Sequence, residues 1–171
     1  MTDYPFKLGL LPPDPSRPRV HLRDHLHEHP HPLHRSWIAK VHDFPMYLND
    51  KWGDCFWAAC GHIIEGLSTY GQGQTVQVPD LDIPTGYEST GFNPDDPSTD
   101  QGTVLQQGLE YWRKTGIGGH KILAFADVDV TNDDELDAAL NLFGALCIGF
   151  TVYTSAMDQF NEGKPWDLPN E

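Results

Sequence analysis

The chain has 171 residues, of which 39% are hydrophobic and 21% charged, a composition that suits one folded domain. Its formal net charge of −14 repels phosphate groups, so neither nucleic acid nor an anionic membrane is an expected partner. No apolar run approaches the ~20 residues of a membrane span, and the first residues lack the layout of a signal peptide. We therefore expect a cytoplasmic protein.

Residues 1–36 differ in composition from the rest and contain seven of the 14 prolines and six of the nine histidines. Proline favours extended backbone, so we expect an extended arm that lies over the domain or reaches a neighbour. Alternate side chains of an extended strand face the same way, which makes His25, His27, His29 and His31 the candidate ligands for a metal. A solvated or partner-binding arm is the simpler interpretation, and we assign no metal and no cofactor.

Residues 37–171 are expected to form the folded domain. Asp54 is a favourable N-cap and predicts a helix from Cys55 to about Glu65, which Gly66 would end. Apolar residues cover most of the circumference of this helix, so it should lie at the centre of the domain. Residues 68–98 are rich in turn formers and predict mainly loop.

The second half of the domain alternates between helical and β-like patterns, which predicts an α+β fold. Helices are expected at 99–115, at 132–143 and at 155–161, the last two with capping-box starts. Strands are expected at 121–128 and 145–153, where β-branched and aromatic residues are frequent.

Cys55 carries the clearest chemistry. It lies in the first turn of the expected helix, where partial positive charge and unpaired N–H groups favour the nucleophilic thiolate. The charge of Asp54 opposes this effect. A cysteine that only packs at a helix start is the alternative, because free cysteines are common in protein cores. Cys60 and Cys147 are interpreted as such core thiols.

Asn49 stands six residues before Cys55, and its carboxamide could donate to an oxyanion. The pattern N-x-x-x-x-D-C-x-W-A-A resembles the papain-like cysteine peptidases, in which glutamine takes the position of Asn49. The ordered series MYLNDKWGDCFWAACGHIIEG, LEYWRKTGI, ALCIGFTV and AMDQFNEGKPWD looks like papain-like proteins of actinobacterial phages, over roughly residues 8–167. The resemblance implies a central nucleophile helix packed with further helices and a partial antiparallel sheet.

A cysteine nucleophile also needs a histidine within hydrogen-bonding reach. In the phage proteins it follows a Pro-Trp-Asp motif, whereas here only residues 168–171 follow that motif. The resemblance therefore implies a sheet that is incomplete at the C-terminus and a site that is incomplete or inactive alone. His120 is a candidate base because two glycines precede it and an apolar segment follows. A loop or capping role for His120 is the alternative. His62 lies ~10 Å along the helix from Cys55, too far to serve.

Two functions compete at this point, and whether the chain is an enzyme stays open. In a peptidase or amidase, Cys55 would attack an amide, a histidine would move the proton, and Asn49 with the Cys55 N–H would hold the oxyanion. In a virion or assembly protein, the same fold would be a binding module. We expect protein or peptide partners, including further copies or virion proteins reached through the arm, and a place in the host cytoplasm or the virion.

Overall fold

The computed structural model describes residues 9–27 and 36–167, and the statements below refer to these ranges. They form a mixed α+β arrangement with five α-helices and one pair of short strands. The elements in chain order are β1 (Leu10–Leu11), η1 (Leu22–Asp24), α1 (Cys55–Gln72), α2 (Asp82–Glu88), η2 (Pro97–Thr99), β2 (Thr103–Val104), α3 (Leu105–Lys114), α4 (Asp133–Phe143) and α5 (Thr154–Asn161), where η marks a 3-10 helix. No helix within the described ranges is both long and apolar enough to span a membrane.

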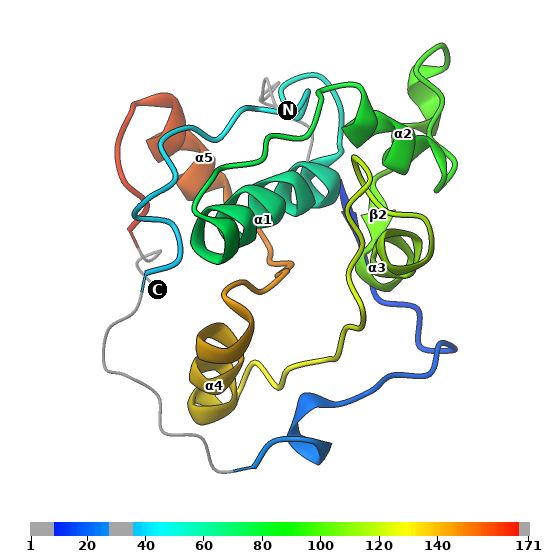
Figure 1. Cartoon of the computed structure of the whole chain (residues 1–171). Helices are drawn as coiled ribbons and strands as arrows, with labels where there is room; N and C mark the ends of the chain where they lie inside the picture. The colour runs from blue at the N-terminus through cyan, green and yellow to red at the C-terminus, as the bar shows by residue number, and fades with distance from the viewer. Residues whose placement is uncertain (1–8, 28–35, 168–171) are drawn as a thin grey trace.

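The helix α1 lies at the centre of the molecule, as its apolar circumference predicts, with α2 and α3 beside it (Figure 1). Two glycines let these neighbours approach closely. A Cβ at Gly86 of α2 would collide with the Trp57 ring, and one at Gly108 of α3 would collide with the Phe56 ring. Trp57 is fully buried, and its indole N–H donates to the Thr103 hydroxyl at 2.9 Å. These contacts make one aromatic core around the first turns of α1.

The helix α1 is longer than the sequence predicts. It passes Gly66 and ends at Gln72, where Gly73 takes the left-handed conformation with φ 73°. A glycine inside a helix costs only about 1 kcal/mol, which the packing of the surrounding turns outweighs. The expected loop at 68–98 therefore holds the last turn of α1 and all of α2.

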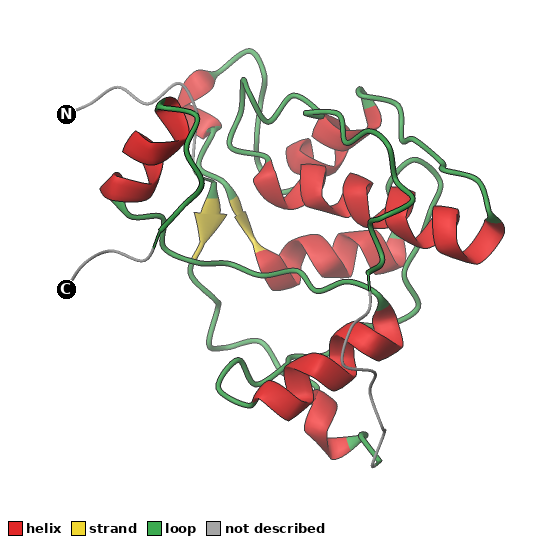
Figure 2. Cartoon of the chain, turned by 90° about the vertical axis from the view of Figure 1, so that its left-hand side faces the viewer, coloured by secondary structure: helices red, strands yellow, loops and turns green. Residues whose placement is uncertain are grey.

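The only strand pair among the described residues is parallel, whereas the resemblance implies an antiparallel sheet. Leu10 pairs with Thr103 and Leu11 with Val104, and Figure 2 shows these two strands side by side. The strands expected at 121–128 and 145–153 do not form. The first makes backbone hydrogen bonds only at Asp127, to residues 20 and 22, and the second makes none before Tyr153. A β-rich sequence needs a paired neighbour to become a strand.

Residues 9–27 pack against the folded part of the chain at several points. Besides β1, the segment donates and accepts backbone hydrogen bonds at Asp127, and Leu22 is buried beside α4. Arg17 pairs with Glu110 at 3.1 Å and Arg19 with Asp127 at 3.3 Å. These ion pairs are partly or fully exposed to solvent and contribute little individually, so the buried leucine and the backbone pairing hold the segment in place.

Candidate functional site around Cys55

Cys55 is the first residue of α1 and is half-buried. Its sulfur makes no hydrogen bond with any described residue. The N–H groups of Trp57 and Ala58 bond to the Asp54 carbonyl, at 2.8 and 3.0 Å. The N–H groups of Cys55 and Phe56 donate to no described residue, as expected for the first turn of a helix. The accessible sulfur therefore stands beside two free backbone donors.

Asn49 lies in the tight turn that leads into α1. Its N–H donates to the Met46 carbonyl at 3.0 Å, and Tyr47 and Leu48 both have positive φ, 52° and 70°. Such a conformation costs about 1–2 kcal/mol for each residue that has a Cβ. The Oδ1 atom of Asn49 is buried and has no hydrogen-bond partner among the described residues. A strained turn thus holds a carboxamide whose oxygen accepts no hydrogen bond from a described residue.

Asp54, the residue before Cys55, is fully buried, and neither of its carboxylate oxygens has a partner among the described residues. Burial raises the pKa of Asp54 to about 7. The backbone N–H of Asp54 itself opposes this rise, and the charges of Asp100 and Asp50 add to it. The carboxyl group is therefore mostly protonated at pH values well below 7. The neutral carboxyl group of Asp54 then opposes a thiolate at Cys55 much less than an ionised carboxylate would.

Asp100 holds the start of α1 from a distant part of the chain. Its Oδ1 atom accepts hydrogen bonds from the Gly53 N–H at 2.9 Å and from the Tyr87 hydroxyl at 2.8 Å. The Tyr87 oxygen in turn accepts the Gly102 N–H at 2.7 Å. Asp100 lies within the helix expected at 99–115, but α3 begins only at Leu105. No local pattern predicts the contact of Asp100 with Gly53, which is 47 residues away.

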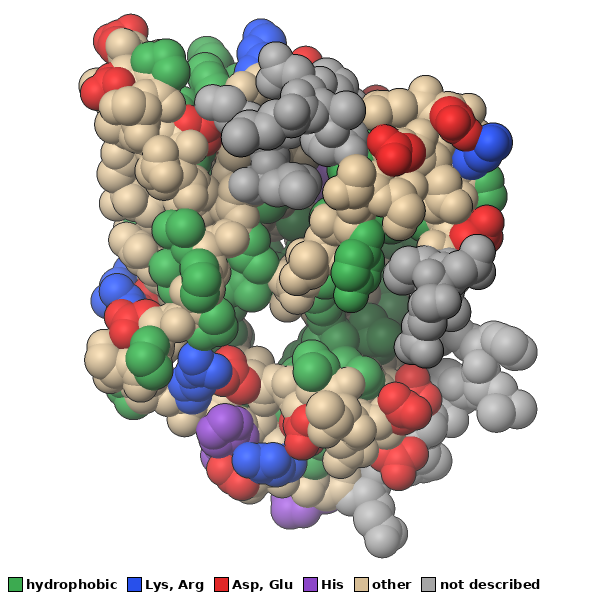
Figure 3. All heavy atoms as spheres, turned by 180° about the vertical axis from the view of Figure 1, so that it is seen from behind, with side chains coloured by type: hydrophobic (Ala, Val, Ile, Leu, Met, Phe, Trp, Pro, Cys, Tyr) green, Lys and Arg blue, Asp and Glu red, His purple; other side chains and the backbone are tan. Residues whose placement is uncertain are grey.

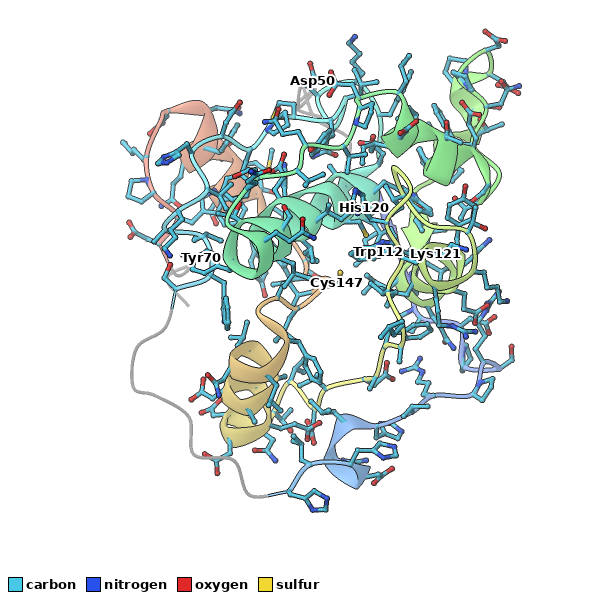
Figure 4. The ribbon with its side chains drawn as sticks, viewed as in Figure 1. Asp50, Tyr70, Trp112, His120, Lys121 and Cys147 are labelled. Atoms are coloured by element: carbon cyan, nitrogen blue, oxygen red, sulfur yellow. The ribbon has the colours of Figure 1, made fainter. Side chains whose placement is uncertain are left out.

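His120 is exposed and closes a tight turn after α3 (Figure 4). Its N–H and carbonyl bond to the backbone of Ile117, and its carbonyl also accepts the Trp112 indole N–H at 3.1 Å. The ring makes no hydrogen bond or ion pair with a described residue. His62 is also engaged elsewhere, since its Nε2 lies 2.8 Å from the Pro45 carbonyl. Neither imidazole is joined to Cys55.

The candidate metal ligands of the arm fall partly outside the described residues, which include His25 and His27 but not His29 or His31. His25 and His27 are exposed. Within the described ranges, no three histidine, cysteine or acidic side chains are grouped so that they could hold a metal ion.

Cys60 and Cys147 lie together, a contact that the sequence does not indicate. Figure 4 labels Cys147 on the segment between α4 and α5, where it packs against the core around α1. Burial raises the pKa of Cys60. A hydrogen bond from Cys60 lowers the pKa of Cys147, because the S–H group stabilises a neighbouring thiolate.

No family model, no curated protein and no solved structure matches the chain. The interpretation of the site therefore depends on its residues and their geometry.

Proposed function

We propose that the chain is a papain-like, cysteine-peptidase-like protein that uses Cys55 as its nucleophile and does not complete a catalytic cycle alone. The observation that carries this proposal is the half-buried Cys55 sulfur at the start of the central helix, beside the N–H groups of Cys55 and Phe56, which donate to no described residue. The resemblance to proteins of actinobacterial phages supports a phage origin, with the host cytoplasm or the virion as its location.

The chemistry would be acyl transfer from a protein or peptide. The Cys55 thiolate attacks an amide carbonyl, and the oxyanion accepts hydrogen bonds from the Cys55 N–H and the Asn49 carboxamide. The carbon–nitrogen bond then breaks, the amine leaves with a proton, and water hydrolyses the thioester. The leaving amine needs an acid to protonate it and the attacking water needs a base, and an imidazole supplies both roles in turn. No imidazole among the described residues is hydrogen-bonded to Cys55. We therefore expect acylation by reagents whose leaving group needs no proton, and no turnover of amides.

The experiment combines alkylation with acylation. Iodoacetamide at pH 6.5 should label Cys55 at least about tenfold faster than glutathione, because a thiolate is the reacting form. Cys60, which is fully buried, should be labelled most slowly. With p-nitrophenyl acetate, one equivalent of p-nitrophenolate should be released and the acetyl group should remain on Cys55.

The matched control is Cys55→Ser, which should lose the stoichiometric release, while Cys147→Ser should keep it. If Cys55 in the folded chain is labelled no faster than glutathione, the hypothesis that Cys55 is an activated nucleophile is wrong. Continued turnover in the Cys55→Ser variant would place the chemistry elsewhere.

A second candidate function is a non-catalytic binding module, such as a virion or assembly protein. The observation that favours it is the placement of His120 and His62, whose hydrogen bonds serve a turn and a loop. A protein of this kind would give neither fast labelling nor acetylation of Cys55, so the same experiment separates the two functions.

A further inference from the structure

Residues 145–153, here called the open segment, have the composition of a buried strand and no strand partner. Their sequence is Ala-Leu-Cys-Ile-Gly-Phe-Thr-Val-Tyr, without a charged residue. No backbone N–H or carbonyl group of residues 145–152 is hydrogen-bonded to a described residue. Ile148, Phe150 and Tyr153 are 59–63% exposed. Unpaired backbone groups together with exposed apolar side chains are what an added strand would cover.

One face of the open segment is already attached to the domain. Cys147 packs against the core beside Cys60 of α1, and Gly149 lies so close to the Leu10 side chain that a Cβ would collide with it. The neighbouring side chains of Ile148 and Phe150 are 63% and 60% exposed, so they lie largely outside these contacts. The segment is thus held in place on one side while its backbone edge is left without a partner from the described residues.

A pocket of about 280 Å³ lies at the end of the open segment. Its walls include Phe150, Val152, Tyr153 and Trp166, and Asp167 is its one charged lining residue. The Phe150 and Trp166 rings meet edge to face with centroids 6.2 Å apart. The volume suits one apolar side chain of a bound segment, with a carboxylate beside it. Figure 3 shows further hydrophobic side chains at the edge of an opening in the molecule.

We propose that the open segment accepts, by β-strand addition, an extended segment of another polypeptide with alternating apolar side chains and a net positive charge. Backbone pairing supplies the affinity, and the pocket selects one apolar side chain. The positive charge complements Asp167 and the net charge of −14. A second copy of this chain fits less well, because it brings a further −14 and an open segment without a basic residue. The inference does not depend on the proposed function of Cys55.

The test uses the full chain and three fluorescent peptides. The basic probe is Lys-Val-Thr-Phe-Thr-Val-Thr-Val-Lys, the acidic probe has glutamate in place of both lysines, and the third has proline in place of alternate threonines. Fluorescence anisotropy should show the basic probe binding about tenfold more tightly than the acidic one, and no binding of the proline probe. Amide hydrogens of residues 145–152 should become protected from exchange.

The matched variants are Thr151→Pro and Thr151→Ala. The Thr151 N–H has no partner among the described residues, so proline removes a donor that only the added strand would use. Thr151→Pro should weaken binding of the basic probe at least about tenfold, while Thr151→Ala should leave it within about threefold. Asp167→Asn should reduce the preference for the basic probe over the acidic probe. This second test can be read even if the Thr151→Pro variant does not fold.

Three outcomes would overturn the proposal. The first is equal binding of the basic and acidic probes, and the second is no binding of either at about 1 mM. The third is a concentration-dependent dimer in analytical ultracentrifugation that Thr151→Pro abolishes, which would make a second copy the occupant of the open segment.

Discussion

At the scale of single residues, Asp54 is the most unusual group in the molecule. An ionised carboxylate without hydrogen-bond partners is costly to bury, and the carboxyl group avoids this cost by keeping its proton. Burial and the neighbouring acids raise the pKa of Asp54 to about 7 from 3.8. The folded chain therefore holds this proton between about pH 4 and 7, whereas the unfolded chain releases it.

This difference predicts a pH-dependent stability that Asp54→Asn removes. Because the folded pKa is raised, the contribution of Asp54 is fully present below pH 4 and is lost as the pH rises through about 7. The free energy of unfolding of the wild type should fall relative to the variant by up to about 1.4 kcal/mol per pH unit in that window. Urea unfolding at pH 4.5, 5.5, 6.5 and 7.5 measures it.

The control for this series is Asp95→Asn, at an exposed carboxyl group, which should follow the wild type at every pH. A constant difference between Asp54→Asn and the wild type across the four pH values would show that Asp54 ionises normally in the folded chain.

The residues of the candidate site are predictable from the sequence only where their placement is local. The start of α1 at Cys55 is predicted correctly from capping preferences over a few residues, but the Asp54 carboxylate makes no capping hydrogen bond. The burial of Asp54 does not follow, because distant residues produce it. Asp100 holds the Gly53 backbone, and Gly9 packs against Gly53 from the start of the chain. No pattern within one window of sequence contains such contacts.

At the scale of elements, small residues decide how closely the helices pack. Gly108 of α3 faces the Phe56 ring, and Gly86 of α2 faces Trp57. Gly71 lies in the last turn of α1, where a Cβ would meet nothing within 4 Å. Glycine therefore has opposite consequences in these helices. Gly108 permits the contact between α1 and α3, whereas Gly71 only weakens α1.

Two alanine substitutions should separate these effects. Alanine is favoured over glycine in a helix by about 1 kcal/mol, so Gly71→Ala should raise the free energy of unfolding by about 0.5–1 kcal/mol. Gly108→Ala has the same propensity gain but forces a methyl group into the Phe56 ring, and overpacking typically costs 1–3 kcal/mol or more. We expect it to lower the free energy of unfolding, by about 1 kcal/mol in urea unfolding. Stabilisation by both substitutions would mean that α3 can move away from Phe56.

Local signals predict the start of α4 correctly, whereas the capping box expected at Ser155 does not form, because α5 begins at Thr154 after Tyr153 without a side-chain cap. The helix α4 begins after Asn132, whose side chain accepts the Glu135 N–H at 3.2 Å, as the capping pattern indicates. The Glu135 carboxylate accepts the Asp129 N–H instead of closing the box. The prediction of a strand at 145–153 is wrong for a different reason. Its residues favour β-structure, but no described segment pairs with them.

At the scale of the whole molecule, most buried apolar residues belong to one main core, and α4 with η1 forms a smaller part outside it. The main core joins residues between Tyr47 and Ile117 around α1, α2 and α3. The helix α4 buries Ala138 and Ala139 and contacts η1 from the start of the chain. Figure 1 shows α4 and η1 together below the main core, and the indole N–H of Trp37 connects to α4 through the Leu140 carbonyl at 3.0 Å. The smaller part thus depends on few buried contacts.

A part with few buried contacts should open locally before the whole chain unfolds. Native-state hydrogen exchange should therefore be faster in α4 than in the first turns of α1. Leu22→Ala removes a buried side chain of η1, a loss that costs about 2 kcal/mol or more, and should raise exchange in α4 while leaving α1 near the wild-type rate. Val20→Ala, at a side chain that is 54% exposed, is the control and should change neither helix. An equal rise in α1 and α4 in the Leu22→Ala variant would mean that the two parts unfold as one cooperative unit.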